Sequence, residues 1–174
     1  MNILKKQYLF LLTLFLLFKT TSFAQGEYAS AYKQAPRPIH SLGAGLGFTT
    51  GYGLSYRYTP SKFGVQVNFA PYKTADVSKF STGLTFLYRL TEGETTSLYL
   101  YEANHYYSSS EMVWDNPSNK NVRKDEAYFN NGVGFGVEIM VASKIGLNLM
   151  TGYASYKNGT ELNITGEAAL YFKF

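Results

Sequence analysis

The chain has no cysteine, a single tryptophan and five prolines among its 174 residues. Without cysteine there can be no disulfides, on which small exported domains with thin cores usually depend, and no lipid anchor on a cysteine at position 25. Beyond the first two dozen residues there is also no long apolar run, which excludes a transmembrane helix. The protein must therefore obtain its stability, and any attachment to a membrane, in another way.

The N-terminal segment has the pattern of a cleaved signal peptide. An apolar run over residues 8–18 follows a short basic start and is too short to span a bilayer. Ser22 and Ala24 then occupy the small-residue positions of a cleavage site. We predict a signal peptide over residues 1–24 and a flexible periplasmic leader over residues 25–38, which lacks periodicity.

The formal net charge of +4 belongs mostly to that signal peptide. The full chain has 16 basic and 12 acidic residues, and Lys5, Lys6 and Lys19 leave with the signal, so the mature chain keeps a net charge of only +1. No basic surface remains that would favour nucleic acid as a partner. The length that remains is typical of one domain.

From Ile39 onward the chain alternates apolar and polar residues with a period of two, as β-strands do. Leu147 and Leu149, for example, fall on one face, and Gly146 and Asn148 fall on the other. Eight segments have this pattern: residues 40–48, 51–58, 62–72, 79–90, 95–107, 128–141, 144–153 and 161–174. Both faces of the segment at 95–107 carry large residues, so the pattern does not determine which of its faces is inside.

The glycines indicate which face of the predicted sheet points outward. They share the polar face, at Gly43, Gly45, Gly47, Gly53, Gly83, Gly132, Gly134, Gly136, Gly146 and Gly152. A solvated face has no reason to prefer glycine, which weakens strands, whereas the interior of an eight-stranded barrel is crowded. The apolar face therefore points outward, where its neighbour must be lipid. The alternative is an exported soluble β-barrel binding protein with the apolar face inside.

The connections between the predicted strands include short turns and one long loop, over residues 107–124. Outer-membrane barrels have short periplasmic turns and longer external loops. With the N-terminus in the periplasm, the long loop falls outside the cell. We therefore predict an all-β fold, an eight-stranded antiparallel transmembrane β-barrel, over residues 39–174.

The last predicted strand carries a family resemblance. The segment "AALYFKF" alternates apolar residues and ends on Phe172 and Phe174. In this respect the chain resembles the small eight-stranded outer-membrane barrels of diderm (Gram-negative) bacteria, the OmpX/OmpA-like type, and its tyrosine-rich strands look like those of Bacteroidota proteins. The resemblance implies location in the cell outer membrane, contact with outer-membrane lipid, and Phe172 and Phe174 as the signal read by the barrel-assembly machinery.

Six charged residues are expected to form a polar network inside the barrel: Arg57, Arg89, Glu102, Glu138, Glu167 and Lys173. Buried charges are tolerated when they are paired and hydrogen-bonded. Because the interior of eight strands is filled rather than open, we expect a plugged, non-porin lumen. The alternative is a gated polar pathway.

The residues indicate no cofactor, and the two histidines show no metal-ligand spacing. The stretch "ANHYYSSSE" weakly resembles the His-x-Ser strand of barrel lipid A deacylases, in which both side chains face lipid. Tyr107 stands two residues after His105, however, and Ser108 falls on the other face unless a bulge intervenes. A lipid-modifying barrel enzyme, with Glu111 orienting the histidine, is therefore an alternative, and we predict no catalytic residue.

The predicted external loop carries the only tryptophan, Trp114, close to Met112. Loops carry function more often than the scaffold does, and an exposed tryptophan can anchor a partner or rest on the membrane rim. We expect a structural, adhesive or accessory-subunit role, with an envelope-complex protein as a possible partner.

Overall fold

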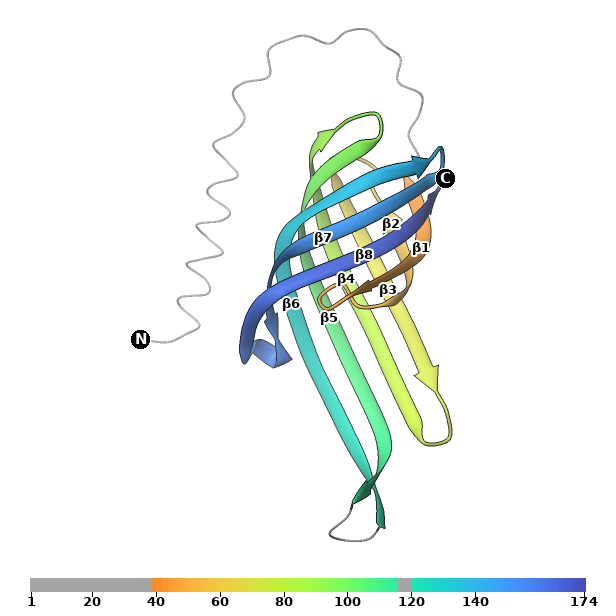
Figure 1. The fold of residues 1–174 in the computed structure, drawn as a ribbon, viewed down its shortest axis with the longest axis vertical. Helices are drawn as coiled ribbons and strands as arrows, with labels where there is room; N and C mark the ends of the chain where they lie inside the picture. Colours follow the sequence, from red (N-terminus) through yellow and green to blue (C-terminus); the bar gives the residue numbers. More distant parts are fainter. Residues whose placement is uncertain (1–38, 116–119) are drawn as a thin grey trace, which may run out of the picture. The chain divides into compact units, whose positions relative to one another are not determined.

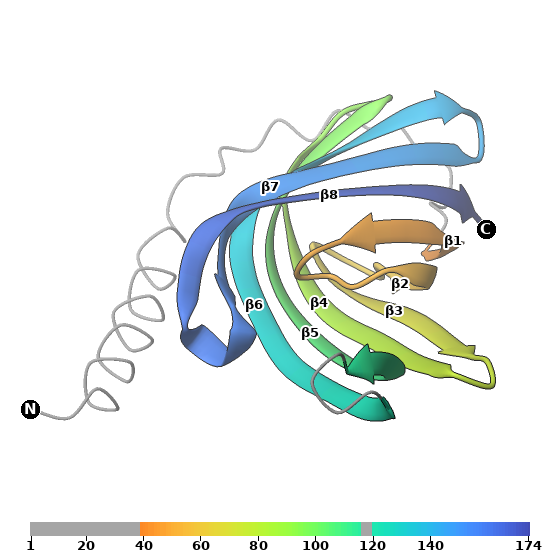
Figure 2. The same cartoon turned by 60° about the horizontal axis from the view of Figure 1, so that its bottom comes forward.

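The computed structural model describes residues 39–115 and 120–174, and the predicted signal peptide and leader lie outside this part of the chain. The described residues form a closed barrel in which each strand pairs antiparallel with the next and β8 pairs with β1 (Figures 1 and 2). The strands are β1 (His40–Gly47), β2 (Gly53–Tyr58), β3 (Phe63–Lys73), β4 (Val77–Glu92), β5 (Thr96–Asp115), β6 (Lys120–Ala142), β7 (Ile145–Tyr156) and β8 (Glu161–Lys173). The predicted eight-stranded antiparallel barrel is confirmed.

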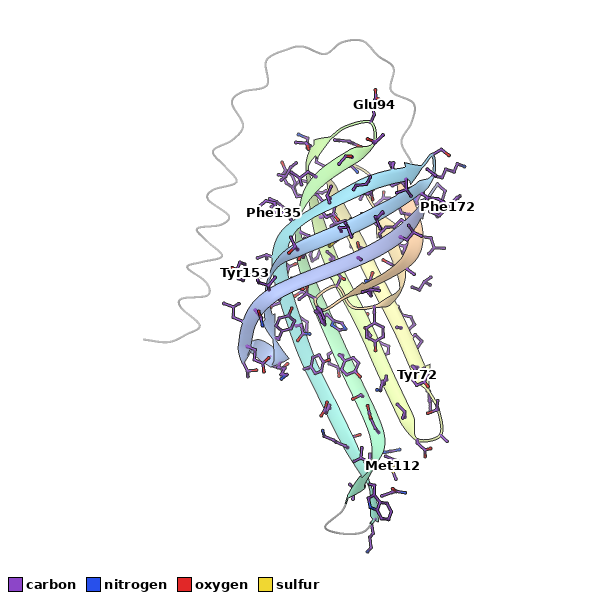
Figure 3. The ribbon with its side chains drawn as sticks, in the orientation of Figure 1. Tyr72, Glu94, Met112, Phe135, Tyr153 and Phe172 are labelled. Carbon is purple, nitrogen blue, oxygen red and sulfur yellow. The ribbon has the colours of Figure 1, made fainter. Side chains whose placement is uncertain are left out.

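The alternation in sequence becomes an alternation between the two faces of the barrel wall. On β7, Asn148 is 1% exposed and points inward, whereas the next residue, Leu149, is 42% exposed and points outward. Large apolar side chains project from the whole outer wall, among them Phe135, Tyr153 and Phe172 (Figure 3). No helix among the described residues has the length and hydropathy needed to cross a membrane.

The two ends of the barrel differ. At one end, short turns join β2 to β3, β4 to β5 and β6 to β7, and the C-terminus lies at this end (Figure 1). At the other end β5 and β6, of 20 and 23 residues, extend far beyond β1 and β2, of eight and six residues. We name the first the periplasmic end and the second the exterior end, after the orientation predicted from the sequence.

The prediction of a long loop over residues 107–124 is wrong. Strands β5 and β6 continue through most of it, with an unbroken register from Tyr107 opposite Tyr128 to Asp115 opposite Lys120. The physical reason is cross-strand pairing, because the Tyr107 ring lies 4.9 Å from that of Tyr128 and Glu111 lies opposite Lys124, and such pairs stabilise neighbouring strands. We call residues 107–115 and 120–128 the projecting hairpin; Met112 lies near its tip (Figure 3).

The last residue helps to close the barrel. Strand β8 ends at Lys173, but Phe174 continues the ladder, because its N–H donates to the carbonyl oxygen of His40 at 3.0 Å and its own carbonyl accepts from the His40 N–H at 3.3 Å. The His40 ring stacks on the rings of Tyr58 and Phe174, with centroids 5.1 and 5.8 Å away. Aromatic residues thus cover the closing seam at the periplasmic end.

Candidate functional site

The periplasmic half of the lumen is filled by an ion-pair network centred on Arg57. Its Nη1 lies 3.0 Å from Glu138 Oε2, and its Nε and Nη2 donate to Gln66 Oε1 at 3.1 and 2.7 Å. Lys173 pairs with the other carboxylate oxygen of Glu138. Arg57 and Glu138 are buried, so the guanidinium and the carboxylate compensate each other inside the barrel, as buried charges require, and the partly exposed Lys173 adds a second cation.

Neutral polar groups extend this network across the lumen. The guanidinium of Arg57 lies over the ring of Tyr171, 4.4 Å from its centroid. The Tyr171 hydroxyl contacts Ser55 Oγ at 2.7 Å, and Ser55 Oγ donates to Asn68 Oδ1 at 2.5 Å. On the other side, the Tyr99 hydroxyl donates to Asn148 Oδ1. Side chains from six strands thus meet in the lumen at this level.

The exterior half of the lumen is closed by the turn between β1 and β2, which folds inward. Thr49 and Thr50 in this turn are buried. The Thr49 hydroxyl donates to Glu167 Oε1, and the Thr50 N–H donates to the same oxygen at 3.2 Å. The turn packs directly on β4 at Gly83, where a Cβ atom would lie 1.7 Å from the Thr50 carbonyl oxygen. We call residues 48–52 the plug turn.

His105 supports the plug turn from β5. Its Nδ1 lies 3.1 Å from the carbonyl oxygen of Phe48, which can only accept a hydrogen bond, so Nδ1 carries the proton. Its Nε2 must then accept from the Ser81 hydroxyl, 2.9 Å away. His105 and Ser81 are both buried. The lipid-facing His–Ser pair of the enzyme alternative is thus not formed, because His105 points into the lumen.

The predicted charged residues occupy three kinds of position. Arg57, Glu138, Glu167 and Lys173 point into the lumen, as described above. Arg89 lies at the periplasmic mouth, where it pairs with Glu92 at 2.9 Å and remains partly exposed. Glu102 differs from the prediction, because it points outward and lies opposite Phe86 and Val133 on the outer face.

The reason for the outward position of Glu102 lies in the glycines of β6. Tyr99 on β5 is opposite Gly136, and Tyr101 is opposite Gly134. A Cβ atom at Gly136 would lie 2.2 Å from the Tyr99 ring, so this glycine makes room for an inward tyrosine. With the tyrosines inside, strand alternation places Glu102 outside. The glycines of β6 are visible in the sequence, but only the strand register shows which side chains of β5 lie opposite them.

A cavity of about 290 Å³ opens at the periplasmic mouth, lined by residues that include Arg57, Arg89, Glu92, Glu138 and Lys173. These five charged groups already form ion pairs with one another. The described part of the chain has no cluster of three or more His, Asp or Glu side chains that could hold a metal ion. The mouth is therefore a vestibule whose main charged groups are paired with one another.

The projecting hairpin carries ion pairs and exposed apolar side chains outside the barrel body. Lys79 on β4 lies 2.9 Å from Glu111, and this hydrogen bond raises the pKa of the lysine. Met112 and Trp114 are exposed on one face of the hairpin, with the Trp114 side chain 57% exposed. These two predicted contact residues thus lie at the end of a strand, and not in a loop.

Comparison with solved structures identifies the fold. The N-terminal β-barrel domain of Pseudomonas aeruginosa OprF matches with a TM-score of 0.55 and 12% identity over 78% of this chain and 95% of that domain. Neisserial surface protein A matches with a TM-score of 0.47 and 17% identity over 78% of this chain and 94% of that protein. No protein-family model and no curated protein sequence matches the chain. The fold is that of the small eight-stranded outer-membrane barrels.

Proposed function

We propose that this chain is an integral outer-membrane protein whose solid barrel anchors and presents the projecting hairpin, in a structural, adhesive or accessory-subunit role. The observation that carries the proposal is the outer wall, which exposes apolar side chains on every strand while polar and charged residues fill the lumen. This arrangement is stable only where the surrounding solvent is apolar. Phe172 and Phe174 at the closing seam are the proposed signal for the barrel-assembly machinery.

The filled lumen supports an anchoring role over transport. The ion pairs of Arg57 and the plug turn occupy successive levels of the interior, and eight strands enclose only enough space for side chains. A barrel of this kind contributes a rigid membrane anchor. The part of it that extends farthest at the exterior end is the projecting hairpin, with Met112 and Trp114 at its exposed end.

Cell fractionation tests the membrane assignment. The mature protein should remain with the outer membrane when membranes are washed with high salt, because apolar burial in lipid does not depend on ionic strength. The folded barrel should also migrate faster on a denaturing gel before boiling than after it. Release by salt alone would instead support an exported soluble barrel.

The lipid-modifying enzyme is the second candidate, and the burial of His105 argues against it. Neither His105 nor Ser81 can reach a lipid from the lumen, and Ser108 lies on the opposite face of β5 from His105. Deletion of the gene should therefore leave the mass spectrum of lipid A unchanged. The appearance or loss of one acyl chain would restore the enzyme hypothesis.

A further inference from the structure

One polar patch interrupts the apolar outer wall. Glu102 and Asn104 on β5 and Asn131 on β6 all point outward, and Asn104 lies directly opposite Asn131. The Asn104 amide donates to Glu102 Oε1 at 2.6 Å. No other hydrogen bond or ion pair to Glu102, and none to the Asn131 side chain, occurs within residues 39–115 and 120–174. We call these three residues the mid-wall patch.

The mid-wall patch lies deep in the apolar band. On the periplasmic side of Glu102, β5 exposes Leu98, and on the exterior side it exposes Tyr106. Each is four residues from Glu102, which is about 13 Å along the strand and about 10 Å along the membrane normal at the usual strand tilt. Because the whole apolar band is about 25 Å tall, the carboxylate lies close to the bilayer midplane, beyond the reach of lipid headgroups.

The fold does not require this carboxylate. The only bond of Glu102 among the described residues joins it to Asn104 on its own strand, whereas the lumen network involves none of the mid-wall patch. Its strand-pair neighbours on the outer face, Phe86 and Val133, are apolar. An ionisable side chain at this depth is expensive and typically indicates a functional contact.

We propose that the mid-wall patch docks a membrane-embedded segment of another protein, which presents a lysine or arginine to Glu102 at the bilayer midplane. Charge complementarity supports this occupant, because a cation with additional hydrogen-bond donors stabilises a carboxylate that is removed from water. A second copy of this chain fits poorly. The outward-facing residues of the described strands include no lysine or arginine between Leu98 and Tyr106 or at matching depth elsewhere, so a symmetric copy would bring carboxylate against carboxylate.

The proposal rests on the membrane insertion proposed above and adds a partner within the membrane. Photo-crosslinking in the native cell tests it. Benzoylphenylalanine replaces Val133, the exposed apolar neighbour opposite Glu102, in one strain, and in a control strain it replaces Leu54, which is 60% exposed on β2 across the barrel. We expect one discrete adduct from position 133 and none from position 54. The peptide crosslinked in the partner should lie in a membrane-spanning segment that contains a lysine or arginine.

The substitution Glu102→Leu supplies the decisive control. It replaces a charge in lipid by an apolar side chain, so the variant should remain in the outer membrane with an unchanged gel shift, whereas the adduct should fall at least tenfold. Glu102→Gln should retain part of the adduct, because it can still accept a hydrogen bond. No adduct, an adduct between two copies of this chain, or an adduct unaffected by Glu102→Leu would overturn the proposal. Loss of the protein from the outer membrane in the unsubstituted strain would instead refute the insertion itself.

Discussion

At the scale of single residues, stability depends on which face of the wall a charge occupies. Arg57 and Glu138 face a closed lumen and compensate each other there. Arg89 and Glu92 make the same kind of pair at the mouth, where both side chains are about one quarter exposed. Because water screens exposed pairs and not buried ones, the two pairs should differ greatly in their contribution to stability.

We expect Arg57→Gln to lower the free energy of unfolding by about 3–5 kcal/mol, because it leaves a buried carboxylate without its main partner. Arg89→Gln should cost at most about 1 kcal/mol, as for other solvent-exposed pairs. Urea unfolding of the barrel in lipid vesicles measures both. Losses of similar size would mean that the lumen is open to water.

At the scale of elements, the plug turn and the projecting hairpin both lie at the exterior end, where the turn folds into the lumen and the hairpin extends beyond the barrel body. The plug turn packs so closely on β4 that Gly83 has no space for a side chain. Gly166 on β8 offers the contrast, since a Cβ atom there would meet nothing within 4 Å. The same substitution at both positions therefore distinguishes the effect of contact with the plug turn from the general effect of replacing a glycine in a strand.

Gly83→Ala should destabilise the barrel by about 1–3 kcal/mol, because the added methyl group displaces backbone that cannot yield easily. Gly166→Ala should leave stability unchanged or raise it by up to about 1 kcal/mol through the unfolded state. Thermal unfolding in detergent compares the two variants. A neutral Gly83→Ala would show that the plug turn is not packed on β4.

The projecting hairpin should be accessible from outside the cell. Lys120, Arg123 and Lys124 lie on its exposed β6 arm and offer cleavage sites to trypsin. Trypsin added to intact cells should cut the hairpin, while the remaining fragments stay together as a folded barrel. Cleavage that occurs only after the outer membrane is permeabilised would reverse the proposed orientation.

At the scale of the whole molecule, the outer wall of the barrel is apolar and its lumen is polar. The depth of a residue in the apolar band should then determine the cost of a charge placed there. Leu149 lies in the middle of β7, and Leu162 lies next to the exterior turn at the start of β8. Both leucines point outward and are exposed, so only their depth differs.

Leu149→Arg should lower the free energy of unfolding by about 2–4 kcal/mol, the value for arginine near the bilayer midplane. Leu162→Arg should lower it by at most about 1 kcal/mol, the value near the interface. Refolding into vesicles followed by denaturant titration gives both numbers. If neither substitution matters, the outer wall faces water and the membrane assignment fails.

The sequence by itself determined the strand pattern, the closed all-β architecture and the outward apolar face, because period-two alternation and the placement of glycine are local properties of the chain. It could not place Glu102, since large residues stand on both faces of β5 and only the pairing of Tyr99 with Gly136 decides between them. It also missed the strands of the projecting hairpin, because their many polar residues do not alternate with apolar ones, and it missed the plug turn. The plug turn depends on contacts between residues far apart in the chain, such as Thr50 with Glu167, and only the closed barrel brings those residues together.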